Sequence, residues 1–136
     1  MTVATEKKYE IVTDWDRAGS ILSGLANQPR LALDFETALK PGFLPVPRYN
    51  IFEVGTGKNK RKEIKAVDAR TADVRLIQMA TTSGEQYIFD MFKIPIQNFK
   101  EFFGSGIEFV AHHSKFEASF LRKYGILPHK WGDTMI

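Results

Sequence analysis

Short apolar runs that are typical of buried strands alternate along this chain with segments of helical periodicity. Residues 31–35 form an almost wholly apolar run after a turn, which is the pattern of a strand buried on both faces. Residues 108–112 are predicted to form another buried strand. Residues 74–81 and 86–90 are β-rich and are separated by four polar or glycine residues, which predicts an antiparallel hairpin.

Three further segments carry signals of helices. Asp14 or Thr13 can cap a helix over residues 15–25, where apolar residues recur at helical spacing. Residues 96–103 and 115–124 are also predicted to be helical, and each is closed by a following glycine. Helices that alternate with strands, together with one hairpin, predict an α/β protein with a mixed sheet.

Composition excludes several classes of protein. The chain has 136 residues, a common length for one domain, and its 43% hydrophobic content excludes global disorder. It has no cysteine, which excludes disulfides, zinc–thiolate sites, thiol nucleophiles and iron–sulfur clusters. No apolar run approaches the ~20 residues needed to span a bilayer, and the first residues are polar. We therefore expect a cytoplasmic protein.

Positive charge is concentrated in one long segment. The net charge is +3, and residues 40–73 contain eight basic but only four acidic residues. This segment reads as an insertion, with a β-hairpin around residues 49–54 and 64–67. A basic segment suits a polyanionic partner such as nucleic acid, although a solvated lysine-rich loop explains the charge equally well. The candidate phosphate-binding residues are Lys58, Lys60, Arg61 and Lys62.

Two carboxylates, Asp34 and Glu36, follow the first apolar run. Because strand side chains alternate, both point the same way, ~7 Å apart along the strand. Like charges ~4 Å apart repel by about 4 kcal/mol at an effective dielectric of ~20, and a divalent cation relieves that cost. Mg²⁺ or Mn²⁺ would suit these oxygen ligands, and paired metals promote phosphodiester hydrolysis. The alternative is that both acids leave the core at the end of the strand.

Glu117 lies on the apolar stripe of the last predicted helix, where an unpaired carboxylate is costly. Ser114 and Glu117 also have the spacing of a capping box, which is the better explanation on this segment alone. Two adjacent residues, His112 and His113, can be satisfied polar groups at the strand-to-helix turn, and we expect no zinc site. The stripe consists of His113, Phe116, Glu117, Phe120, Leu121 and Tyr124.

Four ordered segments resemble the 3′–5′ exonucleases of the DEDD superfamily, and within it the proofreading exonuclease domain of family A DNA polymerases. Residues 31–37 resemble the first motif, Asp-x-Glu after an apolar strand, and residues 74–80 resemble the next strand. Residues 112–117 stand where the second motif reads Asn-x-x-x-Asp, and residues 131–135 resemble the Asp-Thr start of the next helix. The resemblance implies an α/β, ribonuclease H-like fold with a mixed β-sheet flanked by helices.

The resemblance also implies roles for individual residues. It makes Asp34, Glu36 and Glu117 the catalytic residues and the ligands of Mg²⁺ or Mn²⁺ in a two-metal site. It assigns nucleic-acid contacts to Thr37, His113 and Phe116, although His113 replaces the usual Asn and Glu117 the usual Asp. The implied reaction is hydrolysis of the 3′-terminal phosphodiester of single-stranded DNA, which releases nucleoside monophosphates.

The third motif of the superfamily, Tyr-x-x-x-Asp or His-x-x-x-Asp, has no counterpart before Ile136. After Glu117 the remaining acid is Asp133, which we interpret as a helix cap rather than a fourth ligand. Residues 1–136 are therefore expected to be one incomplete exonuclease domain, truncated at the C-terminus, with a basic insertion at about residues 40–73. We expect a complementing polypeptide with the third motif and possibly a polymerase domain. The alternatives are a catalytically silent nucleic-acid-binding module and a polymerase-associated interaction protein.

Overall fold

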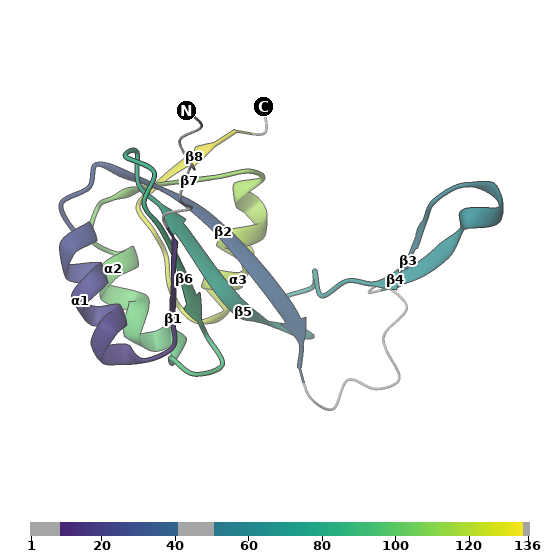
Figure 1. Cartoon of the computed structure of the whole chain (residues 1–136), viewed down its shortest axis with the longest axis horizontal. Helices are drawn as coiled ribbons and strands as arrows, with labels where there is room; N and C mark the ends of the chain where they lie inside the picture. Colours follow the sequence, from purple (N-terminus) through teal and green to yellow (C-terminus); the bar gives the residue numbers. More distant parts are fainter. Residues whose placement is uncertain (1–8, 41–50, 135–136) are drawn as a thin grey trace, which may run out of the picture.

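A six-stranded mixed sheet forms the body of the protein (Figure 1). The structure is a computed structural model that describes residues 9–40 and 51–134. The sheet has the order β1-β6-β5-β2-β7-β8. Its strands are β1 (Tyr9–Val12), β2 (Arg30–Leu39), β5 (Ala72–Ala80), β6 (Gln86–Asp90), β7 (Glu108–Ala111) and β8 (Lys130–Asp133).

Strand directions agree with the predicted α/β class. The central strand β2 pairs antiparallel with β5, and β5 pairs antiparallel with β6, as predicted for that hairpin. On its other side β2 pairs parallel with β7, and β7 pairs parallel with β8. Parallel neighbours need crossover connections, and the helices between the strands supply them. A mixed sheet is the result.

Two strands of the sheet were not expected from the sequence. The strand β1 pairs parallel with β6, and β8 occupies residues that were interpreted as the start of a helix. Both strands have four residues and lie at the edges of the sheet, where polar side chains interrupt the apolar pattern. Such short segments become strands because a neighbouring strand offers its backbone groups, so local periodicity does not reveal them.

The strand β2 is buried on one face and open on the other. Leu31, Leu33 and Phe35 are buried, whereas Asp34 and Glu36 are exposed on the opposite face. The prediction that residues 31–35 are buried on both faces was therefore wrong. The strand also runs on to Leu39, past a β-bulge between Glu36 and Thr37 in its pairing with β5. The exposed face carries the two carboxylates that the sequence singled out.

The helices supply the other wall of a single core. They are α1 (Trp15–Leu25), the 3-10 helix η3 (Ile96–Phe99) that continues into α2 (Lys100–Phe103), and α3 (Ser114–Lys123). Aromatic rings join them to the sheet: Phe89 and Phe99 meet edge to face with centroids 5.1 Å apart, and the centroids of Phe103 and Phe109 lie 4.9 Å apart. These rings therefore fix where η3 and α2 lie against the sheet.

The helix predictions were confirmed in outline. The helix α1 begins after Asp14, whose side chain accepts a hydrogen bond from the backbone N–H of Arg17 at 2.9 Å. The predicted helix over residues 96–103 is present, with its first part as a 3-10 helix. The helix α3 ends before Gly125, which has a φ of 74°. Within the described ranges, no helix is long and apolar enough to cross a membrane.

A separate two-stranded hairpin projects from the sheet on the right of Figure 1. Its strands are β3 (Ile51–Val54) and β4 (Arg61–Ile64), joined through the short 3-10 helix η2 (Gly57–Asn59). They pair antiparallel, with Ile51 opposite Ile64. The predicted hairpin is present, but its second strand covers residues 61–64 instead of the predicted 64–67. Residues 49 and 50 of the predicted first strand lie outside the described residues.

Replacement of Phe109 by alanine should lower the free energy of unfolding by about 3–5 kcal/mol, because this fully buried ring leaves a cavity between α2 and the sheet. Phe92→Ala is the matched control: Phe92 is 64% exposed and contacts mainly the guanidinium of Arg75, 4.1 Å from its ring centroid. We expect the control to cost at most about 1 kcal/mol. Urea denaturation measures both, and equal losses would contradict this core.

Candidate active site

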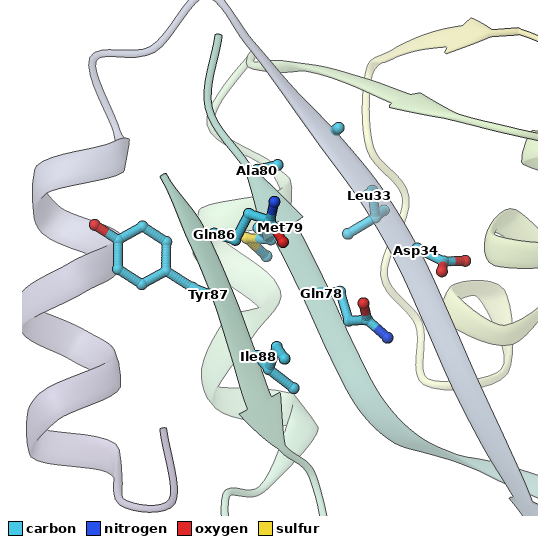
Figure 2. A pocket seen from close by; sticks show the side chains of 9 residues that line it. Leu33, Asp34, Gln78, Met79, Ala80, Gln86, Tyr87 and Ile88 are labelled. Carbon is cyan, nitrogen blue, oxygen red and sulfur yellow. The ribbon is translucent and has the colours of Figure 1, made fainter. Parts of the chain in front are cut away.

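Asp34 lies on the open face of the sheet, at the edge of a shallow hollow (Figure 2). The hollow has a volume of about 240 Å³ and lies over β2, β5 and β6. Asp34 is opposite Gln78 in the β2–β5 ladder, and Glu36 is opposite Leu76. The two carboxylates therefore share this face, as predicted from the alternation of strand side chains. The hollow is lined by Ala32, Leu33, Asp34, Gln78, Met79, Ala80, Gln86, Tyr87 and Ile88.

Glu117 is a buried carboxylate on α3 that lies close to β2. Its side chain is 2% exposed, and among the described atoms Oε2 has no hydrogen-bond partner. Burial, helped by the negative charges of Asp34 and Asp133 and opposed by hydrogen bonds from the backbone amides of Glu117 and Phe35, raises the pKa of Glu117 to about 7. The structure thus brings Glu117 together with Asp34, 83 positions earlier in the chain.

The turn before α3 is held by Asp133 from β8. Its carboxylate accepts hydrogen bonds from the backbone N–H of His113 at 3.0 Å and of Ser114 at 2.8 Å. It also accepts one from the Ser114 hydroxyl at 2.9 Å. The capping-box interpretation of Ser114 and Glu117 was therefore wrong, because another carboxylate satisfies the start of the helix. Glu117 therefore faces β2 instead of capping the helix. Asp133 does act as a helix cap, as interpreted, but it caps α3, which precedes it in the chain, and not a helix that follows it.

His113 occupies a left-handed backbone conformation in this turn, with a φ of 65°. Such a conformation costs a residue with a side chain on the order of 1–3 kcal/mol, so the surroundings must hold it in place. The hydrogen bond to Asp133 does so. The neighbouring His112 pairs through Nδ1 with the hydroxyl of Thr134 at 3.0 Å. Both histidines are therefore exposed polar groups at a strand-to-helix turn, as expected.

The other end of α3 is fixed to the start of β5. Lys123 donates to the carbonyl of Ala72 at 2.6 Å and to the carboxylate of Asp73. The hydroxyl of Tyr124 donates to Asp73 at 3.0 Å and accepts from the N–H of Val74 at 3.3 Å. Burial alone would raise the pKa of Asp73, but the hydrogen bonds from Lys123 and Tyr124 hold it below its ordinary value. Glu117 is thus carried by a helix that is anchored at both ends.

These anchors are positioning residues that the sequence analysis missed. Asp73 was counted only as an acid of the insertion, and Tyr124 only as an apolar member of the stripe. Their partners lie 50 or more positions away along the chain, so no local pattern marks them. Burial raises the pKa of Tyr124 to about 12, so its hydroxyl remains a donor at neutral pH. A tyrosine at the polar end of an amphipathic stripe is the one signal that could have suggested a buried hydrogen bond.

The proposed nucleic-acid contacts lie in three different settings. Thr37 is half-buried, and its hydroxyl donates to the carbonyl of Ala66. Phe116 is half-buried, and its ring centroid lies 5.0 Å from that of Phe120. His113 is exposed next to α3. The four basic residues of the insertion are exposed on the β3–β4 hairpin, which Figure 1 shows projecting away from the six-stranded sheet. All these contacts stay predictions.

Asp34, Glu36 and Glu117 meet some of the requirements of a site for a divalent cation. Asp34 and Glu117 offer hard oxygen ligands, and the buried Oε2 of Glu117 is a polar atom that a cation would satisfy. Glu36 lies two residues further along the same face of β2. In the described part of the chain, however, no three His, Asp or Glu side chains form a group that could hold a metal. The site of Asp34, Glu36 and Glu117 stays a prediction.

Comparison with known proteins identifies the fold. No protein-family model matches the chain, and no curated protein matches it by sequence. The chain is similar to RNase D of Trypanosoma brucei, with 12% identity and a TM-score of 0.64 over 94% of this chain. It is also similar to RNase D of Escherichia coli, with 18% identity and a TM-score of 0.58 over 93%. Its similarity to the EXD2 exonuclease domain has 21% identity and a TM-score of 0.57 over 93%.

These matches establish a shared fold. The predicted ribonuclease H-like fold is therefore confirmed, with a mixed sheet and helices packed on it. At 12–21% identity the solved structures show the fold alone, so both the DEDD superfamily and the proofreading domain of family A polymerases stay proposals. The chain covers 38% of the T. brucei RNase D chain, 27% of the E. coli chain and 56% of the EXD2 domain. It spans about a third of the length of the two RNase D chains.

The stability of the metal-free protein should fall as the pH rises from about 4.3 to about 7. In this interval the unfolded chain has lost the Glu117 proton while the folded protein still holds it, so rising pH favours unfolding. A pKa of about 7 against about 4.3 corresponds to on the order of 3 kcal/mol. Glu117→Gln should remove this decline, as measured by urea denaturation in EDTA at pH 5 and pH 8.

Glu101→Gln is the matched control, because Glu101 is an exposed glutamate on α2. The control should keep the decline of the parent protein. If Glu117→Gln and the parent show the same dependence on pH, Glu117 does not hold the proton that its burial implies.

Proposed function

We propose that this chain carries the carboxylate site of a metal-dependent 3′–5′ exonuclease. The observation that supports this most strongly is the pair of acids at the centre of the fold: Asp34 on β2 lies beside Glu117, which is buried with one oxygen unpartnered. Such a pair lowers the stability of the folded protein, because two nearby carboxylates repel each other and burial disfavours their charged forms. Stability alone therefore does not explain the pair. A polyanion-cleaving enzyme uses them to bind divalent cations.

Asp34, Glu36 and Glu117 would hold Mg²⁺ or Mn²⁺ in this function. When bound, such ions activate the attacking water and stabilise the charge on the leaving oxygen of a phosphodiester. Asp34 and Glu117 would present their oxygens from two elements, and the anchors at both ends of α3 would fix the position of Glu117. With a pKa of about 7, Glu117 holds its proton part of the time at neutral pH and must release it to act as a ligand.

The substrate that we propose is the 3′ end of single-stranded DNA, with release of nucleoside monophosphates in a proofreading role. The Asp-x-Glu motif of residues 34–36 and the strand after it, which resemble family A polymerases, support this substrate. RNase D of E. coli is described as an exoribonuclease involved in structured RNA processing, so RNA is the competing substrate. A cytoplasmic location belongs to the same proposal.

A second candidate is a nucleic-acid-binding module without catalytic turnover. It is favoured by the absence, among the described residues, of three acidic or histidine side chains grouped as a metal site. It is also favoured by Asp133, whose carboxylate is engaged at the start of α3. If the exonuclease proposal holds, we expect the fourth carboxylate to come from a complementing polypeptide that carries Tyr-x-x-x-Asp and possibly a polymerase domain.

Manganese should stabilise the protein through the three carboxylates. A cation that binds only the folded state adds about 1.4 kcal/mol at a tenfold excess over its Kd, which raises Tm by about 3–6 °C. We expect this shift at pH 8 with 10 mM Mn²⁺ and its loss in Asp34→Ala and Glu36→Ala. Differential scanning fluorimetry measures it, with Glu101→Gln as the control that keeps the shift. An equal shift in all variants would place the bound cation elsewhere.

Nuclease activity should depend on a second polypeptide. We expect the 136-residue chain alone to be nearly inactive on a 5′-labelled single-stranded DNA in Mn²⁺. Addition of a polypeptide that carries a Tyr-x-x-x-Asp helix should raise 3′–5′ degradation by at least about 100-fold, because loss of a mere outer partner of a metal ligand already costs about 10–100-fold. Denaturing gels with matched DNA and RNA substrates measure it. Vigorous digestion by the chain alone, abolished by Asp34→Ala, would disprove the dependence, and no digestion in either case would favour the silent binding module.

A further inference from the structure

The β3–β4 hairpin and the next residue, Lys65, together contain all of the net charge of this protein. Residues 51–65 include five basic and two acidic residues, whereas the rest of the chain has 14 of each sign. The five basic side chains are all exposed: Lys58, Lys60, Arg61, Lys62 and Lys65. When the rest of a protein has equal numbers of positive and negative charges and one projecting element carries the excess positive charge, that element attracts polyanions.

Most of this charge is not neutralised locally. Arg61 pairs with Glu63 at 2.9 Å, on the same strand. Within the described residues, no ion pair involves Lys58, Lys60 or Lys62. These three side chains lie at and beside the turn of the hairpin, which is the part of the chain that projects furthest in Figure 1. Their ammonium groups are therefore open to a ligand.

The base of the hairpin is attached beside the carboxylates. Thr37, the residue after Glu36, donates its hydroxyl to the carbonyl of Ala66, two residues after β4 ends. Ala66 and Ala69 pack against the core, so the segment that returns from the hairpin to the sheet is held there. Six extended residues span at most ~20 Å, so Lys60 lies within about that distance of Ala66. The arm therefore starts at the candidate active site and leads away from it.

The contacts that the hairpin offers suit phosphates rather than bases. Its one aromatic residue, Phe52, is half-buried and has the Lys65 ammonium 5.3 Å from its ring centroid. That face of the ring is thus not open for stacking on a base. Exposed lysines, in contrast, contact the backbone of any sequence.

We infer that the β3–β4 hairpin is an arm that binds the phosphates of single-stranded nucleic acid several nucleotides from the 3′ end held at Asp34 and Glu117. This inference rests on the proposed function for the place of the 3′ end. A span of ~20 Å corresponds to about six stacked nucleotides at 3.4 Å each. The arm therefore strengthens the binding of long strands but not of strands of two or three nucleotides. Its contacts with phosphates give this binding no sequence preference.

The test measures binding in EDTA, where no hydrolysis takes place. The variant replaces Lys58, Lys60, Arg61 and Lys62 by serine. We expect its affinity for a labelled 20-nucleotide single strand to fall at least tenfold at low salt. Each lost phosphate contact lowers the slope of log K against log salt by about 0.7, so the slope should fall by up to about 3. The affinity of a trinucleotide competitor should remain within twofold of that of the parent protein.

The matched control removes the same number of charges from the body of the domain, at the exposed residues Lys93, Lys100, Arg122 and Lys130. It should change the salt slope by less than half as much. Equal losses in both variants, an unchanged slope in the hairpin variant, or an equal loss for the trinucleotide would each overturn the arm. An unchanged Tm of the hairpin variant shows that it is folded.

The two proposals can fail separately. If the chain with its complementing polypeptide hydrolyses no nucleic acid but the hairpin variant loses affinity for the long strand alone, the exonuclease fails and the arm stands. If hydrolysis depends on Asp34 but both variants bind the long strand alike, the arm fails and the exonuclease stands.

Discussion

The carboxylate of Asp133 holds the turn at which β7 becomes α3, and the arrangement of the candidate site depends on this contact. It binds two backbone amides and one hydroxyl, and it keeps His113 in a left-handed conformation. Because Asp133 satisfies the start of the helix, Glu117 is not needed as a cap. It can lie against β2 with Asp34. One hydrogen-bonded carboxylate thus allows another to remain buried and unpartnered.

That buried carboxylate is costly, and the fold compensates around it. A domain of this size is stabilised by a margin of about 5–15 kcal/mol, of which the ionised form of Glu117 removes on the order of 3. The aromatic contacts between η3, α2 and the sheet, and the anchors of Lys123 and Tyr124 on Asp73, stabilise the same scaffold. Among the described residues outside glycine, only His113 has a positive φ, and it lies in the turn just before the helix that carries Glu117.

The two faces of β2 separate the hydrophobic core from the carboxylates of the candidate site. Leu31, Leu33 and Phe35 pack into the core, while Asp34 and Glu36 are exposed on the opposite face, where Asp34 lies at the edge of a shallow hollow. Immediately after Glu36 the strand passes a β-bulge, and Thr37 binds the returning end of the insertion. The position where the sheet is least regular is therefore also where the charged hairpin is attached. Core, carboxylates and hairpin meet within one strand.

The sequence alone determined the α/β class, the positions of the main helices, the β5–β6 hairpin and the shared face of Asp34 and Glu36, because these follow from periods of 2 and 3.6 residues. It did not reveal the edge strands β1 and β8, the one-sided burial of β2 or the true cap of α3. The pairing of β7 with β8 places Asp133, 19 residues beyond Ser114, at the start of α3. Because Asp133 caps the helix there, Glu117 faces Asp34 instead of capping its own helix. Local patterns determine which residues share a helix or strand. Which of two carboxylates, Asp133 or Glu117, accepts the backbone amides at the start of α3 depends on tertiary contacts.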